Sequence, residues 1–255
     1  MEKPLTKHII PGSPPLNLKD YRQAGGYSGV HRALKEKSPA EVTSLVKASN
    51  LLGRGGAGFP TGVKWSLVPM DDDRSKPKYL VCNADEMEPG SFKDRYLLEG
   101  NPHQLIAGMI ISAYAIQAQK AYIFLRWAYK KAEGELRKAL AEAYEAGYLG
   151  KNILGSGFYL DINVHSSAGR YICGEETALL NSLEGKRAIP RTKPPFPAIS
   201  GLFGKPTVVN NVETLSWISH IAENGAEWFK GLSLTATGGT KLYGVSGRVK
   251  NPGTW

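Results

Sequence analysis

The chain has 255 residues, 42% of them hydrophobic, enough to bury a full core, and its longest apolar run, Met109 to Ile116, falls far short of the roughly 20 residues that span a bilayer. Two cysteines, Cys82 and Cys173, and five histidines without metal-ligand spacing exclude a disulfide framework, and no bound metal is expected. The net charge of +9 is scattered over glycine- and proline-rich loops, which favours anionic small ligands or an acidic partner protein over nucleic acid.

The N-terminal region, residues 1–38, is rich in Pro, Gly, Tyr and Lys, and it predicts an irregular arm. Its charged start has no apolar stretch behind it, so neither a secretory signal nor membrane insertion is expected, and the protein is predicted to be soluble and intracellular. A helix is predicted to follow, with Ser38 as N-cap, Pro39 at the first helical position and Glu41 completing a capping box.

That helix leads into a glycine-rich stretch, in which Gly53, Gly55 and Gly58 satisfy the G-x-G-x-x-G pattern. A Rossmann fingerprint needs a strand before the motif and a helix after it, whereas here a helix precedes it and a Pro-Thr-Gly turn follows. The glycines still allow the backbone to approach a pyrophosphate closely, and Arg54 and Lys64 supply positive charge. A plain glycine turn is the alternative interpretation.

Beyond this loop, strands are predicted at 79–82, 121–125 and 159–165, with helices at 103–117 and 128–148 between them. This alternation predicts an α/β fold: a Rossmann-like, mostly parallel sheet flanked by helices. Ligands bind at the carboxyl ends of strands in such sheets, so the loops after the first and third strands are where chemistry is expected.

The loop after the first strand carries Asn83, Asp85, Glu86 and Glu88. Carboxylates repel phosphates, so these side chains suit ribose hydroxyls, amide groups or the edge of a nicotinamide or flavin ring. A solvated acidic turn is the alternative interpretation.

After the third strand, Gly174 precedes a helix with an apolar period, so the amides near Glu175 to Thr177 are expected to be free donors at a helix N-terminus. Glu175 and Glu176 either complement the helix dipole or accept hydrogen bonds from a ligand.

Two further segments carry candidate residues. The proline-rich loop 190–197 holds Lys193 and Phe196 with little conformational freedom, although it also fits a polyproline ligand for a partner. Another helix is predicted to start after Val209, with Asn210 as N-cap and Glu213 completing a capping box, which explains both residues without a ligand.

Four stretches, 53–65, 83–95, 168–187 and 193–215, closely resemble the NADH-oxidising flavoprotein subunit of respiratory complex I, known as the 51-kDa subunit family. The resemblance covers essentially the whole chain. It implies FMN as the bound flavin, NADH as the hydride donor, and electrons passed through iron–sulphur clusters to quinone. The same motifs occur in diaphorase subunits of NAD-dependent hydrogenases and formate dehydrogenases. A non-catalytic nucleotide-binding module is the alternative from another class.

The resemblance also implies roles for individual residues. Nucleotide phosphate would be held by Gly53, Arg54, Gly55, Gly56 and Lys64, with Ala57 and Gly58 as further cofactor-binding residues of the same loop. The flavin would be bound by Asn83, Asp85 and Glu86, and the flavin and nicotinamide pocket lined by Tyr171, Gly174, Glu175 and Glu176. The FMN-phosphate side would comprise Val209, Asn210, Asn211 and Thr214, and the NADH side Phe59, Glu88, Lys193 and Phe196. Of these, Glu88 and Glu176 are the residues expected to act in catalysis. Many relatives carry an aromatic residue where this chain has Leu67.

The resemblance further implies a domain division: an arm at 1–38, an FMN- and NADH-binding domain at 39–232, and the beginning of a β-grasp-like domain at 233–255. The family continues into a helical bundle whose cysteines hold a 4Fe–4S cluster, so the chain is expected to be a truncated piece of the 51-kDa-type protein. Its expected partners in the peripheral arm of complex I are the 24-kDa-type subunit and the large iron–sulphur subunit. Its expected location is peripheral, on the cytoplasmic face of the bacterial inner membrane.

Overall fold

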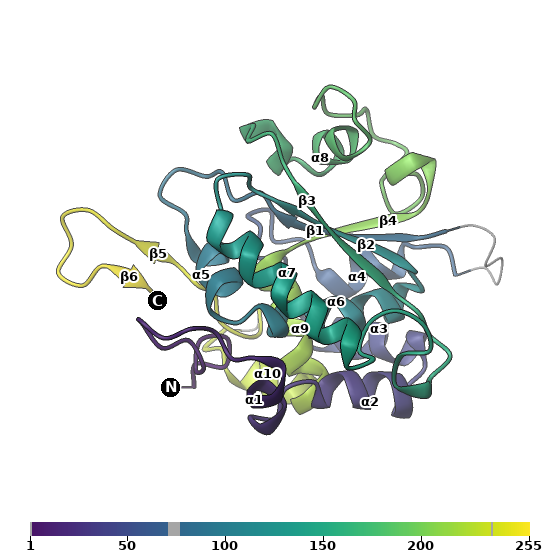
Figure 1. The fold of residues 1–255 in the computed structure, drawn as a ribbon. Helices are drawn as coiled ribbons and strands as arrows, with labels where there is room; N and C mark the ends of the chain where they lie inside the picture. The colour runs from purple at the N-terminus through teal and green to yellow at the C-terminus, as the bar shows by residue number, and fades with distance from the viewer. Residues whose placement is uncertain (1, 71–76, 236) are drawn as a thin grey trace.

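The computed structural model describes residues 2–70, 77–235 and 237–255 (Figure 1). The helices are α1 (Leu18–Gln23), α2 (Ser28–Glu36), α3 (Pro39–Ala48), α4 (Thr61–Ser66), α5 (Lys93–Gly100), α6 (Pro102–Ile116), α7 (Lys130–Glu145), α8 (Glu176–Leu183), α9 (Val212–Asn224) and α10 (Ala226–Gly231). The strands are β1 (Tyr79–Ala84), β2 (Lys120–Leu125), β3 (Asp161–Ser166), β4 (Thr207–Asn211), β5 (Gly244–Val245) and β6 (Gly253–Thr254). Short 3₁₀ turns occur at η1 (Ile153–Gly155), η2 (Tyr171–Gly174) and η3 (Leu202–Gly204).

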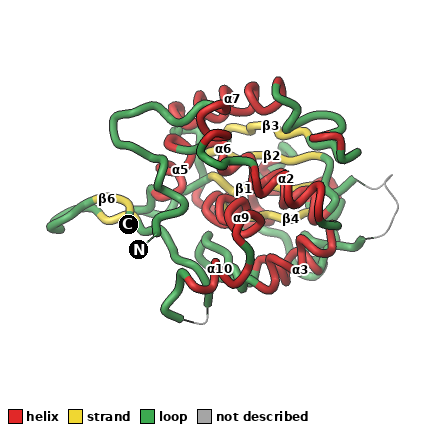
Figure 2. Tube along the Cα trace, turned by 90° about the horizontal axis from the view of Figure 1, so that it is seen from below, coloured by secondary structure: helices red, strands yellow, loops and turns green. Residues whose placement is uncertain are grey.

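The main sheet has the strand order β3-β2-β1-β4, and every pair in it is parallel (Figure 2). The chain builds β1, β2 and β3 outward in one direction and then returns to add β4 on the other side of β1. The strand order therefore reverses between β1 and β4, and in open α/β sheets such a switch point opens a crevice at the carboxyl ends of the strands. The predicted α/β fold with a mostly parallel sheet flanked by helices is confirmed.

Both faces of the sheet are covered, as expected for parallel strands. On β1, Leu80 and Cys82 face the large core made with α6 and α9, whereas Tyr79 and Val81 face a smaller core that includes Leu179 of α8. Figure 1 shows α8 on one side of the sheet and α6, α7 and α9 on the other. The loops at the carboxyl ends of the strands therefore extend from a sheet that is packed on both faces.

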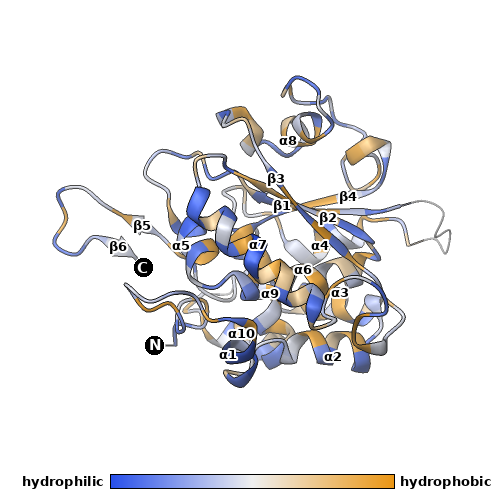
Figure 3. Ribbon diagram, in the orientation of Figure 1, coloured by the Kyte–Doolittle hydropathy of each residue, from blue (hydrophilic) through white to orange (hydrophobic). Residues whose placement is uncertain are grey.

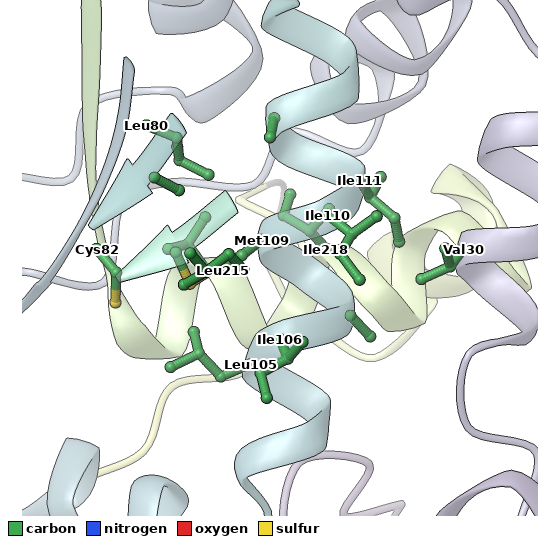
Figure 4. Close-up of a cluster of buried hydrophobic side chains, with 14 of the residues drawn as sticks. Val30, Leu80, Cys82, Leu105, Ile106, Met109, Ile110, Ile111, Leu215 and Ile218 are labelled. Atoms are coloured by element: carbon green, nitrogen blue, oxygen red, sulfur yellow. The ribbon is translucent and has the colours of Figure 1, made fainter. Parts of the chain in front are cut away.

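Helix α6 is the centre of the large core, and all but one of its residues are buried. Ile110 lies beside Ile218 of α9 (Figure 4). A Cβ at Gly108 would overlap the carbonyl oxygen of Leu215, so the two helices approach closely only because residue 108 is glycine. Figure 3 shows the contrast between this apolar helix and the hydrophilic α1 at the surface. Across the described residues, no helix combines the length and apolarity needed to cross a membrane.

Most predicted elements are confirmed to within a few residues: α3 with its capping box between Ser38 and Glu41, then β1, α6, β2, α7 and β3. The prediction of an irregular arm over residues 1–38 is wrong in part, because helices α1 and α2 lie within it. In α2 the buried residues Val30, Ala33 and Leu34 follow a helical period and pack on the large core. The turn predicted after the glycine loop is the start of the short helix α4.

The predicted N-cap of the last long helix is wrong by one residue. Because β4 pairs with β1 as far as Asn83 and Asn211, the chain stays extended through Asn211, and this residue, not Asn210, caps α9 by accepting from the Glu213 amide at 2.9 Å. Asn210 Oδ1 instead accepts from Trp65 Nε1 at 2.9 Å. At the C-terminal end, β5 and β6 form an antiparallel pair, and the division into domains stays a prediction.

Candidate functional site

A cavity of about 820 Å³ lies at the carboxyl ends of β1 and β4, where the strand order reverses. The walls come from the glycine loop, the loop after β1, the start of α5 and the turn η2 before α8. We call it the first cavity. Within the described residues, its lining carries five carboxylates and two cations, so it is acidic in a chain whose net charge is +9.

Asp85 lines the first cavity and carries one unpaired acceptor oxygen. Its Oδ1 accepts from Ser167 Oγ at 2.9 Å, while Oδ2 is buried and has no hydrogen-bond partner among the described residues. Burial raises the pKa of Asp85, and the Ser167 hydrogen bond opposes that rise. Asn83 holds the two walls together, since its Oδ1 accepts from the Asp85 amide at 3.1 Å and its Nδ2 donates to the Gly174 carbonyl at 3.2 Å. An unpaired buried oxygen favours a ligand that donates a hydrogen bond there.

Glu86 lines the cavity, but its carboxylate is committed to the protein. One oxygen accepts from Ser91 Oγ at 2.7 Å and the Asp94 amide at 3.1 Å, and the other accepts from the Arg95 amide and the Tyr129 hydroxyl, each at 3.1 Å. These contacts satisfy the N-terminal amides of α5. The structure therefore gives the Glu86 side chain a role in fixing the loop after β1, and the flavin contact implied by the resemblance stays a prediction.

The glycine loop is closed at its base by the Gly53 amide, which donates to the Phe59 carbonyl at 2.9 Å. Gly56 and Gly58 have φ values of +124° and +67°, a backbone region that side chains disfavour. A Cβ at Gly56 would meet no atom within 4 Å, so open space borders the loop there. The loop thus offers its backbone to a ligand at its tip.

Arg54 points away from that tip. Its guanidinium is buried, donates to the Gly238 carbonyl at 3.2 Å and has Nε 4.0 Å from Glu213 Oε1. Its backbone amide donates to Thr214 Oγ1 at 2.8 Å, which ties the loop to α9. Arg54 and Thr214 therefore support the loop from behind.

Lys93 is a site residue that the sequence analysis did not select. Its Nζ lies 2.7 Å from Asp94 Oδ1, 3.0 Å from Glu213 Oε2 and 3.4 Å from Asn211 Oδ1. Burial lowers the pKa of Lys93, but Asp94 and Glu213 outweigh burial and hold the pKa above its ordinary value. Asp94 also accepts from Asn211 Nδ2 at 2.6 Å, and burial raises its pKa to about 6 even though Lys93 lowers it. Its place inside the stretch 83–95 is the only sequence signal for Lys93.

On the α8 side, two lysines neutralise two glutamates. Lys64 Nζ lies 2.6 Å from Glu176 Oε2 and donates to the Val209 carbonyl at 2.8 Å. Lys193 Nζ lies 3.1 Å from Glu175 and 3.2 Å from Glu176. Burial raises the pKa of Glu176, but Lys64 and Lys193 outweigh it and leave the pKa below its ordinary value.

The prediction of free backbone amides at the start of α8 is wrong. Glu175 is the N-cap, and its Oε2 accepts from the Thr177 amide at 2.8 Å and the Ala178 amide at 2.9 Å. The helix N-terminus is therefore satisfied by its own cap, because a glutamate at this position can reach back over the first turn.

The rim of the first cavity is closed by Tyr171, whose hydroxyl donates to Glu88 Oε2 at 2.6 Å. This hydrogen bond raises the pKa of the Tyr171 hydroxyl. Phe59 and Phe196 lie outside the cavity with about half of their surface exposed, at 50% and 55%, which leaves both rings available for stacking.

The structure brings about half of the predicted site residues together at the first cavity: Arg54, Gly55, Asn83, Asp85, Glu86, Glu88, Tyr171, Gly174, Glu175 and Asn211. Gly53 and Gly56 line a neighbouring second cavity of about 810 Å³. The remaining ones line neither cavity: Ala57, Gly58, Phe59, Lys64, Glu176, Lys193, Phe196, Val209, Asn210 and Thr214. Which of these residues contact a ligand stays a prediction.

Comparison with known proteins matches most of the chain to a known family. Residues 46–220 match the family described as the Nuo51 FMN-binding domain. The chain is 58% identical over 252 residues to the F-type subunit of NADH-quinone oxidoreductase from Salmonella typhimurium and equally identical to that from Escherichia coli, covering 99% of this chain and 56% of each relative. Its identity to the same subunit from Aquifex aeolicus is 52% over 239 residues, or 94% of this chain and 55% of the relative.

A solved structure agrees with this assignment. The NAD⁺-reducing NiFe-hydrogenase in the H2-reduced state superposes with a TM-score of 0.79 and 41% identity, covering 90% of this chain and 38% of that one. The chain spans a little over half the length of the curated relatives it matches. On the family match and the shared fold, this chain belongs to the family of the Nuo51 FMN-binding domain, the 51-kDa subunit family of NADH-quinone oxidoreductase.

Proposed function

We propose that this chain forms the FMN- and NADH-binding part of an NADH:quinone oxidoreductase flavoprotein subunit. The observation that carries the proposal is the cavity at the β1/β4 switch point, which combines a glycine loop with the unpaired oxygen of Asp85. In open parallel sheets, ligands, among them dinucleotides, bind in the crevice at such a switch point. Four relatives among the most similar, including those from Salmonella typhimurium and Aquifex aeolicus, are named as subunits of NADH-quinone oxidoreductase.

The residues present fit a flavin nucleotide. Asp85 Oδ2 needs a hydrogen-bond donor, and a flavin offers a ring N–H and the hydroxyls of its sugar chain. The open backbone at Gly56 suits a phosphate, which a side chain would keep away. Bound FMN would supply the chemistry itself, by accepting a hydride from NADH and releasing electrons singly.

The chain's own residues would orient the dinucleotide. Glu88 lines the first cavity as an acceptor, and Tyr171 holds it at the rim. Acceptors at this position suit the carboxamide of a nicotinamide and its ribose hydroxyls. Phe59 and Phe196 offer exposed rings for the adenine end, and Lys193 fixes Glu175 beside them. Holding the nicotinamide in one orientation next to the flavin is the main contribution the protein makes to hydride transfer.

Of the two glutamates expected to act in catalysis, the geometry favours Glu88. Glu176 lies outside both cavities and is neutralised by Lys64 and Lys193, whereas Glu88 lines the first cavity without an ion-pair partner among the described residues. A carboxylate keeps its electrostatic influence on a ligand only when no cation offsets it at close range.

A diaphorase subunit of an NAD-dependent hydrogenase is the second candidate, and the superposition on the NAD⁺-reducing hydrogenase at a TM-score of 0.79 favours it. The reaction at the flavin would be the same, with the electrons flowing to a different acceptor. The higher identity to the NADH-quinone oxidoreductase relatives, at 58% against 41%, favours the quinone oxidoreductase.

The partners and location follow from the same proposal. Within an intact complex this protein would contact the 24-kDa-type subunit and the large iron–sulphur subunit, and a 4Fe–4S cluster would lie in the part of the flavoprotein beyond this chain. The complex would place it on the cytoplasmic face of the bacterial inner membrane. Co-purification of tagged full-length protein with those two partners tests this part.

An absorption spectrum of the purified full-length protein tests the proposed function. A bound flavin that bleaches when NADH is added without oxygen is the expected result. NADH binding without any flavin would instead identify a non-catalytic nucleotide-binding module. Binding that ignores NADH and weakens steeply with salt would point to nucleic acid.

A further inference from the structure

The loop 190–197 carries Lys193 and Phe196 and has no regular secondary structure to hold it. Residues 190–197 are all described, and none lies in a helix or strand. The Phe196 ring is 55% exposed and is therefore open to stacking by a ligand. Ordering a loop at the moment of binding costs free energy and lowers affinity. Contacts that hold this loop before a ligand arrives therefore raise the affinity for that ligand.

Arg191 makes such contacts with both sides of the loop. Its Nε donates to Asn181 Oδ1 at 2.9 Å and its Nη2 to Glu184 Oε1 at 2.7 Å, both at the C-terminal end of α8. Its Nη1 donates to the Gly201 carbonyl at 2.8 Å, beyond the far end of the loop. A guanidinium is planar and rigid, so these three hydrogen bonds hold α8 and the segment after the loop at a fixed separation.

The backbone of Arg191 connects the loop to the wall of the first cavity. Its amide donates to Thr177 Oγ1 at 2.8 Å, and that hydroxyl donates to Glu175 Oε2 at 2.5 Å. A hydroxyl has a single proton, so accepting from Arg191 leaves this proton for the carboxylate. Glu175 lines the first cavity, and its Oε1 accepts from Lys193 Nζ at 3.1 Å. The contacts therefore run from the loop to the cavity wall and back to the loop.

Glu184 has a second cation beside it, which is less able to position the loop. Its buried carboxylate lies 2.7 Å from both Arg191 Nη2 and Lys186 Nζ, and it accepts from the Phe203 amide at 2.7 Å. The Lys186 side chain is 67% exposed, whereas that of Arg191 is 26% exposed. An ion pair with an exposed lysine contributes little, so the geometry at Glu184 depends mainly on Arg191.

From these contacts we infer that Arg191 is a positioning residue for NADH: its side chain fixes the loop 190–197, which holds Lys193 against Glu175 and keeps Phe196 in one place for the adenosine end of the dinucleotide. The inference rests on the proposed function, which assigns the Phe196 ring to the adenine. Arg191 is not among the described residues that line either cavity, so it acts through the loop and not by touching the ligand there.

Comparing NADH with reduced nicotinamide mononucleotide isolates the adenosine end, because the mononucleotide carries the same hydride donor without the adenylate half. We would measure kcat/KM for both donors in the full-length protein with an artificial electron acceptor. R191M should lose about 10- to 100-fold for NADH, mainly through a higher KM, and stay within about threefold for the mononucleotide, because a displaced loop weakens only contacts beyond the nicotinamide.

Two milder variants carry the same test if R191M does not fold. R191K keeps the charge, but one ammonium cannot reach the three acceptors of the guanidinium, so it should also lose about 10-fold for NADH alone. E184Q keeps an acceptor oxygen and removes the charge, so its loss for NADH should be smaller, about 3- to 10-fold. An unchanged ratio of the two donors in both variants would overturn the inference.

K186M is the matched control, because it removes the other cation of Glu184. It should leave the ratio of kcat/KM for the two donors within about threefold of the unsubstituted protein. A ratio that falls as far in K186M as in R191M would overturn the inference, and so would equal losses for both donors in R191M and R191K, which indicate general damage to the site. Failure of the unsubstituted protein to bind flavin or oxidise NADH would overturn the proposed function itself, whereas an unchanged ratio in R191M overturns this inference alone.

Discussion

The Tyr171 hydroxyl lies 2.6 Å from Glu88 Oε2, and this contact joins the turn before α8 to the loop after β1 at the rim of the first cavity. The two residues are 83 positions apart in the sequence. Glu88 is thereby held where a ligand in the cavity would meet its carboxylate, whereas Glu176 is held by two lysines outside the cavity.

This difference predicts unequal effects of two neutral substitutions on NADH oxidation. We expect Glu88→Gln to lower kcat/KM for NADH about 10-fold, equivalent to about 1.4 kcal/mol of lost stabilisation, and Glu176→Gln to lower it less than about threefold. Steady-state NADH oxidation by the full-length protein with an artificial acceptor measures both. A larger loss for Glu176→Gln than for Glu88→Gln would show that the outer glutamate is the one that acts on the substrate.

Glu86 is expected to matter for stability. Its carboxylate accepts four hydrogen bonds, two of them from amides at the start of α5. Glu86→Gln replaces one acceptor oxygen by a donor that faces other donors, so unfolding should become easier by about 2–4 kcal/mol in urea denaturation. Glu88→Gln is the control two residues away, and it should change stability by less than about 0.5 kcal/mol. Similar effects of the two substitutions would refute the structural role of Glu86.

Substituting alanine for glycine should change the stability of the protein in opposite directions at Gly108, where α6 contacts α9, and at Gly134 of α7. Gly108→Ala puts a methyl group into the Leu215 carbonyl and should destabilise the protein by several kcal/mol or prevent folding. Gly134→Ala on the exposed face of α7 meets no atom within 4 Å and should stabilise by about 0.5–1 kcal/mol, because alanine favours helix. Thermal unfolding of both variants checks this, and a stable Gly108→Ala protein would contradict the helix packing.

His220 makes the stability depend on pH. Burial, with a smaller contribution from Lys7 and His8, lowers its pKa to about 3, and the neutral ring contacts Gln104 Oε1 at 2.8 Å. A lowered histidine pKa means that the unfolded chain binds the proton more tightly, so stability is fully present above pH 6.5 and falls as the pH drops below that value. Between pH 7.5 and pH 5 the free energy of unfolding should fall by about 1–2 kcal/mol less in His220→Gln than in the unsubstituted protein. Identical pH profiles for the two proteins would refute the assignment.

Local signals allowed much of the fold to be predicted. Ser38, Pro39 and Glu41 mark the start of α3 by a pattern complete within four residues. The apolar runs of β1 and β2 and the period-two alternation of β3 are long enough to identify. β4 was missed because its five residues run directly into α9, and whether Asn211 is strand or cap depends on its pairing with Asn83 in β1. Pairing between distant segments cannot be read from a short window.

The candidate site shows the same limit. The sequence placed Asp85 and Glu88 in a functional loop because they follow a strand, and both line the first cavity. It could not separate Glu86 from them, since the decisive partner of Glu86, Tyr129, is 43 residues away. Nor could it select Lys93, because its partners Glu213 and Asn211 come close to it only in the fold.

A crystal structure of the full-length protein with FMN tests the central claim most directly. We expect flavin density in the first cavity, at the carboxyl ends of β1 and β4, with a donor of the flavin within hydrogen-bond distance of Asp85 Oδ2. Flavin density at any other place on the sheet, with Asp85 Oδ2 still unpaired, would contradict the account.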